Sequence, residues 1–239
     1  MNKELLSIAT ITWARTASED KLLRTSLQEL AKLQIPVFIC DGGSGKAFTD
    51  FLNNFPHFTL LPRKAAGVWW QVKISIQAAY ESGSAYILYT EPDKYEFFNT
   101  SLPGFLDNEE ANEQNGVMLA SRSAQAFNSF PAFQKSTETT INFCCSEITG
   151  KPLDYTYGPF LFNRKLVPYF DLVQEDIGWG WRPFVFGIAK RLGYEITQQV
   201  GNFACPVDQR ADDSKERIYR MRQLSQNIEG IVLSTSVIV

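Results

Sequence analysis

The segment Ile35-Pro36-Val37-Phe38-Ile39-Cys40-Asp41-Gly42-Gly43-Ser44-Gly45 carries the most informative local pattern in the chain. Its first half is an apolar run rich in β-branched and aromatic side chains, which is typical of a buried strand, and this run ends in an acidic turn rich in glycine. Residues 5–12 have the same strand character, and leucines recur at helical spacing after about Ser18. The predicted order is therefore strand, helix, strand and glycine turn.

The same alternation continues beyond this turn. Helices are predicted around 48–53 and 68–82, and strands at 58–61 and 85–90. Regular alternation of this kind favours an α/β fold with a parallel sheet covered by helices on both faces, whose ligand crevice lies beyond the carboxyl ends of the strands. We therefore expect the site to be built from the loops that directly follow three of these strands, at 13–15, 41–46 and 91–94.

Between residues 107 and 162 the local patterns are weaker. The polar run 107–115 predicts a solvated loop or helix end, and 117–121 and 160–162 predict two further strands. Aromatic residues mixed with a proline at 127–133 indicate an irregular stretch.

The last part of the chain predicts two helices and a tail. The helices are expected over 182–192 and 214–228, and the apolar residues 231–239 indicate a final strand or a packed tail. The length of 239 residues suits one α/β domain. We expect this domain to have two halves, at about 1–100 and at about 101–239.

Composition disfavours several classes of protein. The chain has 23 Lys and Arg against 26 Asp and Glu, a net charge of -3, so we expect no nucleic-acid partner. We also expect no signal peptide or transmembrane segment and a cytoplasmic location, because no apolar run has the required length. The cysteines lack CxxC spacing, and the single histidine, His57, disfavours Ser-His and Cys-His catalysis. The sequence leaves open whether the protein forms a homodimer.

Two carboxylates lie one residue apart where the strongest predicted strand ends, in Thr90-Glu91-Pro92-Asp93-Lys94. Side chains at positions i and i+2 of an extended turn project to the same side, so Glu91 and Asp93 can converge on a hard cation such as Mg²⁺ or Mn²⁺. Pro92 stiffens the turn, which lowers the cost of ordering it. The alternative is an acidic turn that is simply solvated.

The turn that begins at Asp41 ends an earlier strand of the same predicted sheet. An acidic side chain there can accept hydrogen bonds from a ribose or a base, and Gly42 and its neighbours let the backbone approach a ligand closely. The spacing is not that of a Walker A phosphate loop. A tight turn without a ligand is the alternative.

Together these segments resemble the GT-A glycosyltransferases, particularly the family 2-like nucleotide-sugar transferases, over most of the chain. Residues 8–12 are similar to the family's first strand, 39–44 to its DGGS turn, and 86–93 to the strand that ends in its DxD metal motif, which reads ExD here. The resemblance implies a Rossmann-like, open, mostly parallel sheet flanked by helices, with a nucleotide-binding half at about 1–100 and an acceptor half at about 101–239. It also implies a hexosyltransferase that moves a sugar from a nucleoside-diphosphate sugar to a hydroxyl acceptor with Mn²⁺ or Mg²⁺.

The resemblance also implies roles at the donor nucleotide. Glu91 and Asp93 would hold the metal, and Asp208 would complete its shell where related enzymes often have a histidine. Asp41 would contact the base or ribose, and Arg210 would clamp the diphosphate through its planar donors. The residues expected to contact the nucleotide are Thr12, Arg15, Asp41, Gly42, Lys64, Gly67, Lys73 and Arg210.

On the acceptor side, segments 157–164 and 175–182 resemble the family's sugar and acceptor pocket. Exposed tryptophans beside carboxylates suit sugars, because the ring packs on C–H groups while the acids accept hydrogen bonds from hydroxyls. Glu175 or Asp176 is the candidate general base, and a helix cap is the alternative role for Asp176. The expected substrate contacts are Trp70, Gly158, Trp179 and Trp181, with Trp69 as the core member of the Trp69-Trp70 pair.

Two other functions stay open at this point. A sugar-phosphate nucleotidyltransferase would share the sheet order, but it needs a basic, glycine-rich loop after the first strand, which Trp13-Ala14-Arg15-Thr16 matches poorly. A carbohydrate-binding or nucleotide-binding protein that has lost catalysis would fit the ExD variation and the missing histidine. Nucleotide binding without turnover would identify the latter.

Overall fold

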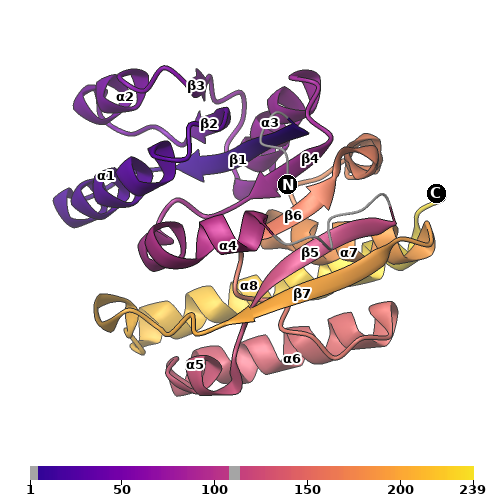
Figure 1. Ribbon diagram of the computed structural model, residues 1–239. Coiled ribbons are helices and arrows are strands. Elements are labelled where there is room, and N and C mark those ends of the chain that lie inside the picture. The colour runs from indigo at the N-terminus through magenta and orange to yellow at the C-terminus, as the bar shows by residue number, and fades with distance from the viewer. Residues whose placement is uncertain (1–4, 108–113) are drawn as a thin grey trace. The chain divides into compact units, whose positions relative to one another are not determined.

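A computed structural model describes residues 5–107 and 114–239, except for the side chain of Asp208. Most of the predicted polar run 107–115 therefore lies outside the described residues. The chain divides into two compact units (Figure 1). The first unit comprises Met1–Glu113 and Pro159–Val167, and the second comprises Gln114–Gly158 and Pro168–Val239.

The first unit contains a five-stranded part of the sheet. Four strands are parallel, as the sequence predicts, and the fifth runs antiparallel to its neighbour. Thr12 pairs with Asp41 and Ala9 with Tyr89, so three neighbouring strands end along one edge. In spatial order the strands are β3 (Phe58–Leu61), β2 (Val37–Asp41), β1 (Leu6–Thr12), β4 (Tyr86–Tyr89) and β6 (Phe160–Asn163).

Three helices of the first unit begin within a few residues of the predicted positions, near 17, 46 and 68, whereas the helical residues 97–106 were not predicted. Thr16 and Glu19 form a capping box at the start of α1, in which each side chain accepts a hydrogen bond from the other residue's backbone N–H. α3 packs across β1 and β2 and buries Trp69, Val72 and Ile76 completely. The helices are α1 (Ala17–Ala31), α2 (Lys46–Asn53), α3 (Val68–Glu81), the π-helical turn η2 (Phe97–Ser101) and α4 (Leu102–Leu106).

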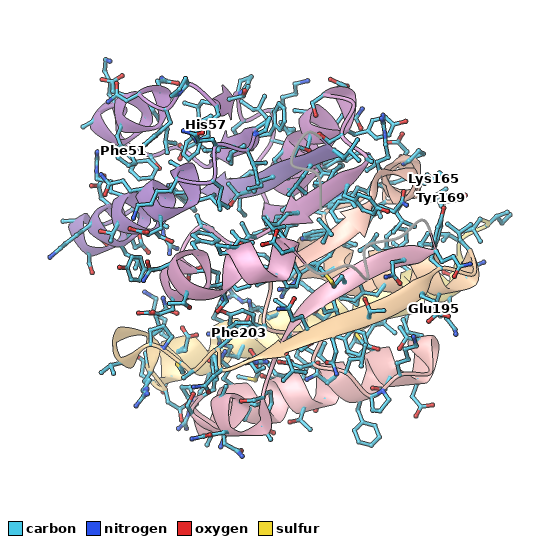
Figure 2. The ribbon with its side chains drawn as sticks, viewed as in Figure 1. Phe51, His57, Lys165, Tyr169, Glu195 and Phe203 are labelled. Atoms are coloured by element: carbon cyan, nitrogen blue, oxygen red, sulfur yellow. The ribbon has the colours of Figure 1, made fainter. Side chains whose placement is uncertain are left out.

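The second unit combines a pair of parallel strands with a group of helices. β5 (Asn115–Arg122) pairs with β7 (Glu195–Gly201); in Figure 2, Glu195 is labelled where β7 begins and Phe203 is labelled beyond its other end. The long helix α8 packs against α6 and α7. The helices are α5 (Ala124–Asn128), α6 (Ala132–Thr149), α7 (Trp181–Arg191) and α8 (Ser214–Ser236), with 3₁₀ turns η3 (Arg164–Leu172), η4 (Gly178–Gly180) and η5 (Val207–Gln209).

The structure differs from the sequence predictions mainly in this second unit. α6 and β7 were not predicted, and α6 replaces the end of the expected irregular stretch 127–133. The expected strand or tail at 231–239 is wrong, because α8 continues as helix to Ser236 and packs along α6 and α7. No helix among the described residues has the length and apolar character needed to cross a membrane.

Candidate functional site

The Asp41 carboxylate joins the loops that follow β1 and β2. Its Oδ1 accepts hydrogen bonds from the backbone N–H groups of Gly43 at 2.8 Å and Ser44 at 2.6 Å. Its Oδ2 accepts from the hydroxyls of Thr12 at 2.8 Å and Ser44 at 2.6 Å. The Ser44 hydroxyl oxygen in turn accepts from the backbone N–H of Ala14 at 2.8 Å. One buried carboxylate therefore holds both loops in place.

These contacts change the roles expected for Asp41 and Thr12. A carboxylate offers about four lone-pair sites, and the four hydrogen bonds from the loops occupy them. Asp41 is 8% exposed and Thr12 is 2% exposed. The expectation that both side chains contact the nucleotide is therefore corrected, because they are buried and bonded to each other. They support the loops instead.

Gly42 is closely packed against its neighbours. A Cβ atom at this position would lie 3.0 Å from Trp13 Cβ and 3.0 Å from Gln71 Oε1, which is tighter than ordinary contact. The Gly42 carbonyl accepts a hydrogen bond from the Arg63 guanidinium. The next residue, Gly43, has φ of +117°, a conformation that favours glycine. The turn thus needs its glycines for its own geometry.

Trp13 presents a large aromatic surface beside this turn. Its side chain is 49% exposed, and the Arg15 guanidinium lies 5.3 Å from its ring centroid. Arg15 also pairs with Glu19 in the first turn of α1. The expected nucleotide contact of Arg15 therefore involves a guanidinium that is already placed over the Trp13 ring.

The carboxylates of Glu91 and Asp93 lie in the turn that follows β4. The Thr10 hydroxyl donates a hydrogen bond of 2.7 Å to the carbonyl of Thr90, which ties the start of this turn to β1. Both acids are half-buried. Among the described side chains, no group of three or more His, Cys, Asp and Glu is arranged to hold a metal. The two acids therefore fit a hard cation only if further oxygen ligands come from elsewhere.

The loop before α3 carries the other residues expected near the phosphates. Lys64 is exposed, and Gly67 has φ of +113° immediately before the helix. The Lys73 ammonium lies 5.8 Å from the ring centroid of Trp69. Trp69 is fully buried and Trp70 is half-buried, which confirms the expected division of this pair.

In the second unit, Asp176 has a structural contact and Glu175 is exposed. Asp176 Oδ1 accepts a hydrogen bond of 2.9 Å from the backbone N–H of Gly178, at the start of η4. This bond joins residues two positions apart and is not the helix cap that the sequence left as the alternative, because Ile177 and Gly180 are the N-caps of η4 and α7 and neither helix has a side-chain cap. The general-base role of either acid stays a prediction.

The two tryptophans expected to bind substrate differ in exposure. Trp181 is 0% exposed and packs edge to face against Phe170 at a centroid distance of 6.1 Å. Its expected exposure is wrong, because it opens α7, which is buried along most of its length. Trp179 is half-buried, donates a hydrogen bond of 3.2 Å from Nε1 to the Tyr219 hydroxyl, and has Arg182 5.2 Å from its ring centroid.

Gly158 and Arg210 both serve the local backbone. Gly158 is buried with φ of +128°, which a residue with a side chain rarely adopts. The Arg210 guanidinium donates to the Cys205 carbonyl from Nε at 3.3 Å and from Nη2 at 3.1 Å. The backbone N–H of Cys205 donates to Ser129 Oγ at 2.8 Å. Asp208 lies between Cys205 and Arg210 in the chain, and its side chain is outside the part that the structure describes.

Comparison with known proteins identifies the fold. No protein-family model matches the chain, and no curated protein sequence matches it significantly. Glucosyl-3-phosphoglycerate synthase from Mycobacterium tuberculosis in complex with UDP superposes with a TM-score of 0.66 at 12% identity, covering 98% of this chain and 81% of that one. Its complex with Mn²⁺, UDP-glucose and phosphoglyceric acid superposes with a TM-score of 0.64 at 12% identity, covering 98% of this chain and 80% of that one. Its complex with Mn²⁺, UDP-glucose and glycerol 3-phosphate superposes with a TM-score of 0.63 at 13% identity, covering 98% of this chain and 81% of that one.

The chain has the GT-A fold. The sequence resemblance is thus confirmed at the level of the fold, and the mostly parallel α/β sheet of the GT-A type is the one that the sequence predicts. In this GT-A chain the three expected site loops follow β1, β2 and β4, which are neighbours in the first unit.

Three residues lie in loops that the sequence predicts at the site or beside the nucleotide, but the sequence assigned none of them a contact of its own. Trp13 offers an exposed ring, Ser44 bridges two loops and Arg63 bonds the Gly42 carbonyl. Trp13 had a usable signal, since a large aromatic residue directly after a buried strand is out of place in a solvated loop. The partners of Ser44 and Arg63 are distant in the chain, so no local pattern indicates them.

Proposed function

We propose that this GT-A protein is a glycosyltransferase that moves a sugar from a nucleoside-diphosphate sugar to a hydroxyl acceptor, with Mn²⁺ or Mg²⁺. The observation that carries the proposal is the shared sheet edge of the loops at 13–15, 41–46 and 91–94, which follow three neighbouring parallel strands. Ligands of open α/β sheets bind beyond the carboxyl ends of such strands. The structural neighbours, which were solved with UDP, UDP-glucose and Mn²⁺, support this ligand class.

The first two loops suit a nucleoside. The half-exposed Trp13 ring provides a face on which a base can stack, and the Asp41–Ser44 network keeps that ring's loop in place. Gly42 and Gly43 leave the turn without side chains that would keep a ligand away. Lys64, Lys73 and Arg210 supply positive charge for the phosphates.

The third loop suits a metal-bound diphosphate. Glu91 and Asp93 supply carboxylate oxygens, and the ligand's own phosphate oxygens would complete the coordination that no third described side chain provides. Asp208 is the proposed additional ligand. When bound, a divalent cation stabilises the negative charge that develops on the departing diphosphate.

For the acceptor, we propose Glu175 or Asp176 as the base that removes the hydroxyl proton. Both acids are exposed, and one oxygen of Asp176 already accepts a hydrogen bond from the Gly178 N–H. Trp179 offers the partly exposed ring for a sugar. The four cysteines are free thiols, which supports a cytoplasmic location.

Nucleotide binding by an Asp93 variant tests the metal-dependent part of this function. We expect calorimetry to show UDP or GDP binding that Mn²⁺ strengthens, and Asp93→Asn to lose the strengthening because one carboxylate no longer binds the cation. Hydrolysis or transfer of UDP-glucose should fall by at least about 100-fold, the scale at which electrostatic groups contribute. Asp50→Asn, in a surface pair with Lys46, is the control.

Full activity in Asp93→Asn would reject the metal role. Nucleotide binding without turnover in the unaltered protein would instead favour a binding protein that has lost catalysis.

A further inference from the structure

We propose that the second unit holds a separate pocket for a neutral saccharide, apart from the donor site. A cavity of about 720 Å³ lies between α5, α6, the residues 152–154 and the end of β7. This volume is within the range of about 300–1,000 Å³ that small-molecule pockets occupy. None of the residues assigned above to a nucleotide, metal or acceptor lines it. The inference therefore goes beyond the proposed function.

The rim of this pocket exposes apolar side chains. Phe143 on α6 is 70% exposed and Val200 on β7 is 55% exposed, and Phe127 on α5 lines the same cavity. Large apolar side chains gathered around one hollow mark a binding site more often than scattered ones do. An aromatic face packs well on the C–H groups of a sugar ring. The rim therefore suits a ligand with an apolar face.

Charge at the floor of the pocket disfavours an anion. Arg122 is the one cation that lines it among the described residues, and its Nε and Nη2 donate to Asp154 at 2.7 and 2.9 Å. Arg122 also pairs with Glu138 at 2.8 Å. One guanidinium thus faces two carboxylates, so the cluster carries a net negative charge. A phosphate or carboxylate ligand would meet no available positive charge.

The remaining polar groups match hydroxyls. Thr139, Asn128 and Gln198 line the cavity, and their side chains make no hydrogen bond to another described residue. Hydroxyl and amide groups both donate and accept, as sugar hydroxyls do. A purely apolar ligand would bury these groups without partners, which is costly. Apolar rings together with neutral donors and acceptors therefore indicate a neutral saccharide.

The test is saturation-transfer difference NMR on the full chain without metal or nucleotide. Maltose, cellobiose and N-acetylglucosamine are the neutral probes, glucose 6-phosphate is the anionic probe and octanol is the apolar one. We expect at least one neutral probe to bind saturably. Phe143→Ala should weaken that binding about fivefold, the scale of a lost ring contact, and Gln198→Ala should also weaken it. Val232→Ala, at an exposed site on α8, is the matched control and should bind as the unaltered chain does.

Three results would overturn the proposal: no neutral probe binds, glucose 6-phosphate or octanol is the only ligand, or Phe143→Ala binds as tightly as the control. Retained saccharide binding in Asp93→Asn supports a pocket that is independent of the donor site. Failure of nucleotide binding with retained saccharide binding would remove the proposed function while leaving this pocket.

Discussion

At the scale of single residues, hydrogen-bonded acids with little exposure hold loops in both units. Asp41 accepts hydrogen bonds from Thr12 at the end of β1 and from Ser44 in the loop after β2. Asp154 accepts hydrogen bonds from Arg122 and Thr156. A hydrogen bond to a charged group contributes about 1.5–3 kcal/mol, so such acids govern local order strongly. Each can be tested by removing one partner.

Ser44→Ala should weaken nucleotide binding more than it weakens the fold. The change removes the hydroxyl that accepts from Ala14 and donates to Asp41, so the loop that carries Trp13 loses its link to the turn. We expect the free energy of unfolding to fall by about 1–2 kcal/mol. Calorimetry with UDP and Mn²⁺ should show affinity reduced about tenfold, since each factor of ten corresponds to about 1.4 kcal/mol.

The control is Ser136→Ala, an exposed position on α6. Equal UDP affinity in the two serine variants would show that the Ser44 bridge does not position the binding loop.

Asp154 should make the free energy of unfolding depend on pH below about pH 4. Burial alone would raise its pKa, but the hydrogen bonds and charge of Arg122 outweigh burial and lower the pKa from 3.8 to about 2. A carboxyl group with a lowered pKa stabilises the fold above its unfolded pKa, and this stabilisation is lost as pH falls toward the folded value. We expect a loss of about 2 kcal/mol from this group between pH 4 and pH 2.

Urea unfolding measured between pH 2 and 6 checks this expectation. Asp154→Asn should lower stability at neutral pH and flatten the dependence below pH 4, whereas Asp50→Asn, an exposed acid, should change neither. An unchanged acid slope in Asp154→Asn would show that another group causes it.

At the scale of elements, glycines allow the η4 turn to lie directly on α8. A Cβ atom at Gly230 would be 1.9 Å from the Gly180 carbonyl oxygen, and one at Gly180 would be 2.1 Å from the Gln226 carbonyl oxygen. The Gly178-Trp179-Gly180-Trp181 motif, which the resemblance placed in an acceptor loop, therefore also forms a contact between backbones. Its glycines are explained by packing, and Trp179 alone of its tryptophans keeps an exposed face.

Gly230→Ala should destabilise the protein although alanine favours helices. Alanine gains about 1 kcal/mol of helix propensity over glycine, but overpacking costs about 1–3 kcal/mol or more when backbone must move. We expect a net loss of about 2 kcal/mol in the free energy of unfolding, measured by urea titration. Ser225→Ala, at an exposed position of the same helix, should be neutral or slightly stabilising. A more stable Gly230→Ala protein would contradict the close contact.

At the scale of the whole molecule, the chain passes between the two units at residues 113–114, 158–159 and 167–168. The first unit therefore needs Pro159–Val167, which includes β6, to complete its part of the sheet. Neither unit is a continuous segment that can fold without interrupting the other. The single domain that the sequence predicts stays a prediction, which unfolding measurements can test.

Scanning calorimetry should accordingly show one unfolding transition. We expect the calorimetric and van 't Hoff enthalpies to agree, because the interleaved units unfold together. Saturating UDP with Mn²⁺ at about 100 times its Kd should stabilise the native state by about 2.7 kcal/mol and shift the whole transition upward. Two separate transitions, of which UDP shifts only one, would show that the units unfold independently.

Local sequence was enough to predict the four parallel strands of the first unit, its first three helices and the loops that follow β1, β2 and β4. Strands such as 35–40 and the turn beginning at Asp41 are encoded by neighbouring residues, so periodicity and glycine spacing reveal them. The Trp69–Trp70 division follows from the expectation that one of two adjacent aromatic residues belongs to the core. α6 escaped prediction because its Thr-, Ser- and Cys-rich sequence has weak helix propensity, and contacts with α7 and α8 accompany it in the fold.

The roles of individual side chains depended on the three-dimensional contacts. Asp41 and Thr12 became supports of the loops, and Trp181 became a core residue. Each outcome depends on partners far away in the chain, such as Ala14 for Ser44 or Gly180 for Gly230. Spacing along a sequence indicates which face a residue occupies, but burial and hydrogen-bond saturation arise only when distant segments pack together.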